Sequence, residues 1–260
     1  MALEAQGDAF PATRYSVISA ARSDDPAERS RAIEAITTFY WKPVYKYVRL
    51  RWSVDVEDAR DFTQDFFLRL IEKDFLDSYD PEKGRLRTFL RTCVDRLFLN
   101  QSRDAHRLKR GGALGHIPLD FDEAEREFVQ MAHQSGQTPH SPEDYFEKEW
   151  VRTLFALAVE RLRGRCASEG KGLHFELFAG YDLDDSESRP SYAGLAARFN
   201  LAGTDVTNYL AFARREFRRC VLEQLREMTG SEEEFRREAQ FLLGIGPECK
   251  MQSPEMKAPK

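Results

Sequence analysis

Apolar residues recur at intervals of three and four along most of this chain, and runs that alternate β-branched with polar residues are nearly absent. Such intervals place side chains on one face of an α-helix, whereas a half-buried strand requires an interval of two. The sequence therefore predicts an all-α fold. With 260 residues, the chain is long enough for two helical domains of about 100 residues each.

The composition is typical of a folded protein without a membrane-spanning segment. Apolar residues make up 42% of the chain and charged residues 32%, which excludes disorder for most of its length. No window has the roughly 18 uninterrupted apolar residues that cross a bilayer. The first ten residues have neither a basic start nor an apolar run. We therefore expect a cytoplasmic protein that makes no contact with membranes.

Neither a metal site nor a catalytic site is predicted. The four cysteines are far apart in the sequence, and only five histidines are present, so a structural zinc site is not expected. The nearest approach to a phosphate-binding loop, residues 164–172, has one residue too many between its glycines, and Gly172 replaces the hydroxyl residue after the lysine. We expect no cofactor and no enzymatic activity.

The first predicted domain covers residues 12–104. Pro43 favours the start of a new, second helix near residue 40, and Asp55 is a suitable N-cap for the third helix. The expected helices cover residues 27–39, 40–52, 55–73 and 85–103. The buried stripe of the third of them should consist of Phe62, Phe66, Leu70 and either Phe67 or Ile71.

A linker and a second domain follow. Residues 105–141 contain several glycines and histidines and are predicted to be a linker with one short helix at residues 122–133. The second domain, residues 142–228, begins with Ser141 as a cap and a proline at the first helical position. Its expected helices cover residues 142–165, 173–180, 192–199 and 205–225. The last two fit a helix-turn-helix unit.

Residues 229–260 are predicted to form a terminal helix and a frayed tail. The helix begins with three consecutive glutamates, which suit the positive end of the helix dipole. This helix has two possible roles: it regulates the protein, or it packs on the second domain.

One face of the helix at residues 205–225 is predicted to bind DNA. Asparagine can pair with adenine, small apolar groups can touch a thymine methyl, and arginines can hold phosphates. The alternative is an ordinary helix with a solvated basic face. Ala202 has no side-chain oxygen that could cap this helix, so Thr204 is an alternative cap. The residues assigned to this surface are Thr204, Thr207, Asn208, Ala211, Arg214, Arg215 and Arg218.

The helix at residues 85–103 and the loop before it are a second candidate surface. Tyr79, Arg87 and Arg91 combine an aromatic ring with cations, and unstacked bases bind to aromatic and guanidinium planes. A melted DNA strand is therefore a plausible ligand. The alternative is a surface helix whose arginines are balanced by neighbouring acids.

The two domains also carry motifs that resemble a known family. Residues 56–70, VEDARDFTQDFFLRL, and residues 84–90, GRLRTFL, resemble the second conserved region of bacterial RNA polymerase sigma factors. Residues 191–199, SYAGLAARF, resemble the fourth region. The order and spacing are similar to those of the extracytoplasmic-function type, which keeps only these two domains and a linker.

The resemblance implies a role for each surface. Core RNA polymerase would be bound by the acidic face with Asp58, Asp61, Gln64 and Asp65. The melted minus-ten strand would be bound by Tyr79, Arg87, Arg91, Asn100 and Arg103. The helix-turn-helix would read the minus-thirty-five element of duplex promoter DNA. An antagonist protein is a further partner that sigma factors of this type can have.

The net charge of −5 agrees with a factor that binds a larger enzyme first, because the field of the whole molecule repels nucleic acid. Two rival functions remain open. One is a helix-turn-helix regulator that binds duplex DNA as a dimer without polymerase. The other is a helical scaffold that binds no nucleic acid.

Overall fold

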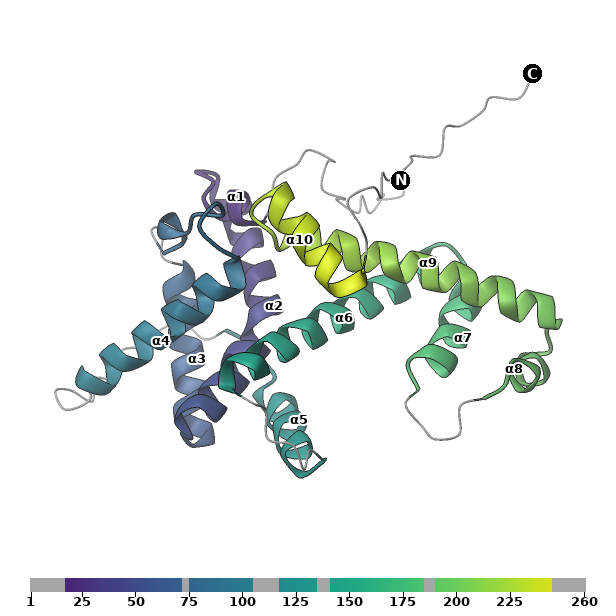
Figure 1. The fold of residues 1–260 in the computed structure, drawn as a ribbon, viewed down its shortest axis with the longest axis horizontal. Helices are drawn as coiled ribbons and strands as arrows, with labels where there is room; N and C mark the ends of the chain where they lie inside the picture. The colour runs from purple at the N-terminus through teal and green to yellow at the C-terminus, as the bar shows by residue number, and fades with distance from the viewer. Residues whose placement is uncertain (1–16, 72–74, 105–116, 135–140, 185–189, 245–260) are drawn as a thin grey trace, which may run out of the picture.

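The computed structural model describes residues 17–71, 75–104, 117–134, 141–184 and 190–244. Within these ranges the chain forms ten α-helices, one short 3-10 helix and no strand (Figure 1), so the prediction of an all-α fold is confirmed. The helices are, in chain order, α1 (Val17–Ala21), α2 (Pro26–Trp52), α3 (Val56–Ile71), η1 (Leu76–Ser78), α4 (Leu86–Asp104), α5 (Phe121–Gln134), α6 (Pro142–Ser168), α7 (Gly172–Asp182), α8 (Tyr192–Phe199), α9 (Gly203–Glu227) and α10 (Glu232–Leu243).

The predicted new helix at Pro43 is wrong, because α2 is one continuous helix of 27 residues. A proline inside a helix costs about 3 kcal/mol, since it lacks an N–H donor and its ring meets the preceding turn. Around Pro43, however, most side chains are almost fully buried, and each large one contributes about 1.5–3 kcal/mol through burial. This packing outweighs the cost of the proline. The buried residues of the segment include Phe39, Tyr40, Val44, Tyr45, Tyr47 and Val48.

Capping residues begin several helices as predicted. The Asp55 carboxylate accepts a hydrogen bond from the backbone N–H of Asp58 at 2.8 Å, at the start of α3. The Ser141 hydroxyl accepts one from the backbone N–H of Asp144 at 3.0 Å, at the start of α6. The short helix expected in the linker is also confirmed, as α5.

The buried face of α3 is completed by Phe67 and not by Ile71. Phe67 is fully buried, whereas Ile71 is 48% exposed. The predicted end of this helix, residue 73, lies outside the described residues.

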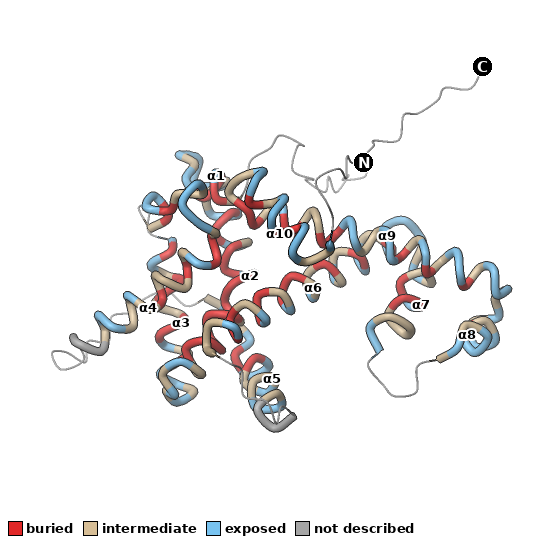
Figure 2. The backbone as a smooth tube through the Cα atoms, viewed as in Figure 1, coloured by how far each residue is buried: buried red, intermediate tan, exposed pale blue. Residues whose placement is uncertain are grey.

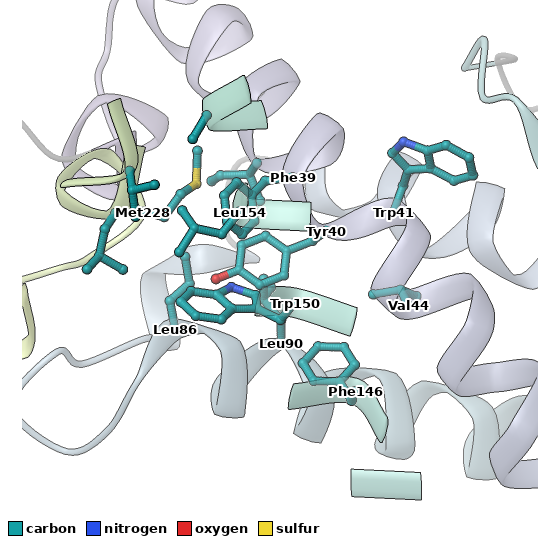
Figure 3. Close-up of a cluster of buried hydrophobic side chains, with 14 of the residues drawn as sticks. Phe39, Tyr40, Trp41, Val44, Leu86, Leu90, Phe146, Trp150, Leu154 and Met228 are labelled. Carbon is teal, nitrogen blue, oxygen red and sulfur yellow. The ribbon is translucent and has the colours of Figure 1, made fainter. Parts of the chain in front are cut away.

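Buried side chains from both predicted domains form one apolar cluster (Figure 3). Figure 2 shows buried residues along both α2 and α6. The centre of the cluster is aromatic, with ring centroids 5.7 Å apart for Phe39 and Trp150 and 5.5 Å apart for Tyr47 and Phe146. In each pair the first ring belongs to α2 and the second to α6. At its other end α6 packs on α7 and α9. The predicted boundaries of the two domains stay a prediction, and α6 is the helix that connects them.

A buried cation joins α2 to both α5 and α6. Lys46 is 1% exposed, and its Nζ lies 2.5 Å from Glu149 Oε1 on α6 and 2.6 Å from Glu127 Oε2 on α5. The second oxygen of Glu149 lies 2.5 Å from Arg152 Nη1. A charge removed from water at this depth is tolerated only while it stays paired.

The described residues contain neither a membrane-spanning helix nor a cluster of metal ligands. No helix within the described ranges combines the length and the apolar character that crossing a bilayer requires. Across the same ranges, no group of three or more histidine, cysteine, aspartate or glutamate side chains is arranged to hold a metal ion.

Removing the buried cation should destabilise the protein strongly. We expect Lys46→Met to lower the free energy of unfolding by about 3–5 kcal/mol, because it leaves the buried Glu149 without one of its two counter-charges. The double variant Lys46→Met/Glu149→Leu should recover most of this loss, since it removes both buried charges. Urea unfolding followed by circular dichroism measures both values. A double variant as unstable as the single one would contradict the ion-pair explanation.

Candidate nucleic-acid interface

The first candidate surface is the acidic face of α3. Asp58 and Asp61 are exposed there, and at a spacing of three residues they lie on the same side of the helix. Within the ranges that the structure describes, neither carboxylate forms an ion pair. Both are therefore available to a basic partner.

The two other residues predicted for this surface have partners within the chain. Gln64 Nε2 donates a hydrogen bond to the backbone oxygen of Ile117 at 2.7 Å, and its Oε1 accepts one from Ile117 N at 3.0 Å. Asp65 pairs with Arg69 Nε at 2.9 Å and accepts a hydrogen bond from Gln101. Gln64 thus holds the segment before α5, and Asp65 holds α4.

Tyr79, predicted to stack on a base, is only 3% exposed. Its hydroxyl lies 3.1 Å from the backbone oxygen of Gly84 and 3.2 Å from Glu234 Oε2 of α10. Its ring packs on Phe89, with the centroids 5.3 Å apart. Burial and the Glu234 carboxylate raise the pKa of Tyr79 above its ordinary value, so the hydroxyl stays a neutral donor.

Arg87, predicted as a cation for the same strand, is also 3% exposed. Its Nη1 lies 2.6 Å from Glu238 Oε2, and its Nε lies 2.6 Å from Glu147 Oε2. The guanidinium lies over the Trp150 ring, 4.3 Å from the centroid. The expectation that Tyr79 and Arg87 form an open surface is therefore wrong for this conformation, because α6 and α10 cover them.

The remaining residues of the predicted strand-binding set lie further along α4. Arg91 is half-buried and Asn100 is exposed. Arg103 belongs to the last turn of α4, and its side chain lies outside the part of the structure that is described. Among the members whose side chains are described, Arg91 and Asn100 are the two that a ligand can reach in this conformation.

The face of α9 predicted to bind DNA is open. The opposite face is fully buried, with Val206, Leu210 and Ala213 at 0% exposure. Before α9, α8 ends at Asn200, whose φ of 51° is left-handed. The helix-turn-helix assignment stays a prediction. All seven residues of the predicted surface are exposed: Thr204, Thr207, Asn208, Ala211, Arg214, Arg215 and Arg218.

Arg214 differs from Arg215 and Arg218 because it forms a close, two-pronged ion pair, whereas Arg215 Nε lies 3.8 Å from Glu216 Oε1. Its guanidinium donates hydrogen bonds to both carboxylate oxygens of Asp182, at 2.9 and 3.0 Å, and one to the Tyr192 hydroxyl at 3.3 Å. The hydrogen bonds to Asp182 raise the pKa of Arg214. The side chain of Arg215, by contrast, is 70% exposed. Arg215 and Arg218 are therefore better placed than Arg214 to hold phosphates.

The alternative cap at Thr204 is wrong. The N-cap of α9 is Ala202, which makes no side-chain cap hydrogen bond, and the helix begins at Gly203. Thr204 therefore lies inside the first turn, where its hydroxyl cannot act as the cap.

Sequence reasoning missed the residues that surround Tyr79 and Arg87, among them Arg85, Glu234 and Glu238. Glu238 Oε1 lies 2.9 Å from Arg85 Nε. Ser231 and Glu234 have the spacing of a capping box, and the Ser231 hydroxyl does accept a hydrogen bond from Glu234 N at 3.1 Å. The Glu234 carboxylate, however, reaches the first domain, and no local pattern predicts that.

A comparison with family models gives a match in the first half of the chain. Residues 40–108 match the model described as Sigma-70 region 2. This match supports a sigma factor family. It covers the segment from Tyr40 in α2 through α3 and α4, which carries both the acidic face and the predicted strand-binding set. Region 2 implies interaction with core RNA polymerase and promoter DNA. No curated protein and no solved structure gives a significant match to the chain.

The pairing of Arg214 predicts unequal effects of the arginines on DNA binding. We expect Arg215→Gln and Arg218→Gln each to lower the salt slope of binding to duplex promoter DNA by about one. Arg214→Gln should have a smaller effect, because Asp182 already neutralises that guanidinium. Fluorescence anisotropy over a salt series measures the slopes. Equal losses for Arg214→Gln and Arg218→Gln would contradict this order, and Asp182→Asn should increase the slope by freeing Arg214.

Proposed function

We propose that the chain is a sigma factor of the extracytoplasmic-function type that binds core RNA polymerase in the cytoplasm and directs it to selected promoters. The observation that carries the proposal is the match of residues 40–108 to sigma-70 region 2. In that segment, α3 presents Asp58 and Asp61 to solvent. The proposed factor is not an enzyme, because the polymerase performs the nucleotide chemistry.

The proposed contact with polymerase depends on the exposed carboxylates of α3. A protein partner with basic groups would be attracted to two carboxylates on one helix face, and such complementarity mainly sets specificity and the rate of association. Gln64 and Asp65 contribute by holding the neighbouring segments. The docking surface proposed for this chain therefore centres on Asp58 and Asp61.

The proposed contact with the minus-thirty-five element depends on α9. Its exposed face places Asn208 and Ala211 between Thr204 at the start and Arg215 and Arg218 further along. Side chains near the start of a recognition helix read base edges, and arginines beyond them hold phosphates. This division supports major-groove binding by α9.

The proposed contact with the melted minus-ten strand depends on α4. Arg91 and Asn100 are accessible as the chain stands, whereas Tyr79 and Arg87 require that the covering helices move. Free protein should therefore bind a single strand weakly.

Charge reversal on α3 tests polymerase docking. We expect Asp58→Arg/Asp61→Arg to abolish capture of core RNA polymerase, because the basic partner then meets like charge. The matched control is Glu34→Arg/Glu176→Arg, two exposed acids outside the matched segment with the same change in charge. A pull-down with purified core enzyme measures capture, and transcription from a promoter library with wild-type protein tests the function as a whole. Unchanged capture by the α3 variant, or no promoter-dependent transcription, would overturn the proposal.

Base readout by α9 is tested separately. We expect Asn208→Ala to relax the preference for one base pair of the minus-thirty-five element, at a cost of about 1–3 kcal/mol if the contact with adenine is bidentate. Competition among promoter variants, with the factor bound to core polymerase, measures the preference. Identical base preferences before and after the change would remove Asn208 from readout.

A further inference from the structure

The terminal helix α10 lies across the beginning of α4 and the loop that contains Tyr79. In Figure 1, α10 folds back beside the end of α9, and its start lies towards the helices of the first domain. Two glutamates one turn apart on α10 face this domain and are almost completely buried, Glu234 at 3% and Glu238 at 1% exposure. Charged side chains are rarely buried to this extent without a specific partner.

Glu238 pairs with two arginines: Arg85, which directly precedes α4, and Arg87, which lies in its first turn. Its Oε1 lies 2.9 Å from Arg85 Nε, and its Oε2 lies 2.6 Å from Arg87 Nη1. One anion thus joins two guanidinium groups. Arginine binds carboxylate and phosphate oxygens with the same geometry, so Glu238 occupies a position that a phosphate group could take.

Glu234 binds the start of α4. Its Oε1 accepts a hydrogen bond from the backbone N–H of Leu86 at 3.1 Å, and its Oε2 accepts one from Gly230 N at 2.7 Å. The Tyr79 hydroxyl lies 3.2 Å from Oε2. Burial raises the pKa of Glu234, against these hydrogen bonds, which lower it. The first N–H groups of a helix attract anions, and here the carboxylate occupies that place.

The turn before α10 also fits closely against this loop. A Cβ atom added to Gly230 would lie 2.8 Å from Pro81 Cβ and 3.0 Å from the Tyr79 hydroxyl oxygen. Contacts this short require the turn or the loop to move. The approach of α10 therefore depends on shape at Gly230 as well as on charge at Glu234 and Glu238.

We infer that α10 is an intramolecular cover that competes with nucleic acid for the Tyr79 loop and the first turn of α4. The inference rests on the proposed function, in which these residues contact the melted strand. Glu234 and Glu238 hold the groups that would otherwise bind phosphates and bases. Departure of α10 first uncovers Tyr79 and releases Arg85 from its ion pair, because Glu147 and Trp150 of α6 still hold one side of Arg87.

Two variants of the full chain open the cover in different ways. Glu238→Gln removes the charge that joins Arg85 to Arg87, and Gly230→Ala introduces the steric conflict without changing any charge. The matched controls are Glu233→Gln, which removes an exposed charge from the same helix, and Gly180→Ala, where an added Cβ meets nothing within 4 Å.

Binding of a fluorescent single-stranded oligonucleotide to the free protein is the first measurement. We expect both opening variants to bind about tenfold more tightly than wild type. This change corresponds to a loss of about 1.4 kcal/mol in the stability of the covered state relative to the open one. The two controls should stay at the wild-type value. An affinity gain in Glu233→Gln equal to that in Glu238→Gln would overturn the inference, since charge alone would then explain it.

Hydrogen exchange gives a second readout that does not depend on nucleic acid. The amides of α10 and of Leu86 should exchange faster in both opening variants than in the controls. Unchanged exchange in both variants, or faster exchange without tighter oligonucleotide binding, would overturn the cover. Failure of the wild-type protein to capture core polymerase would instead overturn the proposed function, so the two failures are distinguishable.

Discussion

The contact between α2 and α6 is the interaction on which the rest of the structure depends. Trp150 and Phe146 of α6 pack on rings of α2, and Lys46 of α2 pairs with Glu149 of α6. The apolar burial supplies most of the attraction, while the ion pair fixes how the two helices align, since a misplaced buried charge is costly. α6 then carries α9, and α9 leads to α10, which returns to the first domain.

The distribution of charge explains how an acidic chain can have surfaces for an anionic ligand. Acidic side chains on α5 and α10 form ion pairs with cations of the same chain. One example is Glu125, whose Oε1 lies 2.7 Å from Arg49 Nη2. Arg215 and Arg218 of α9 face solvent, and Asp58 and Asp61 of α3 do so on another helix. The basic surfaces are small, and one of them is covered. Tight binding of free protein to DNA is not what this arrangement favours, whereas binding in the context of a larger enzyme is.

The exposed residues of the candidate site were predictable where their exposure depends on the apolar face of a single helix. The exposed positions of α9 follow from its apolar face, and the exposure of Asp58 and Asp61 follows from that of α3. Prediction failed where the partner is distant in sequence. Tyr79 and Arg87 have the residue types of a strand-binding surface, yet their partners Glu234 and Glu238 lie 155 and 151 positions further along the chain. Pairing of Arg214 with Asp182 across 32 positions escaped for the same reason.

The sequence by itself determined the all-α class, the caps at Asp55 and Ser141, and the apolar face of α9, because these depend on residues within a few turns of one another. Only the tertiary structure decided that α2 continues through Pro43, that Gln64 and Asp65 have hydrogen-bond partners within the chain, and that α10 covers the start of α4. Each of these depends on a neighbour brought close by packing, and such long-range contacts leave no periodic pattern in the sequence.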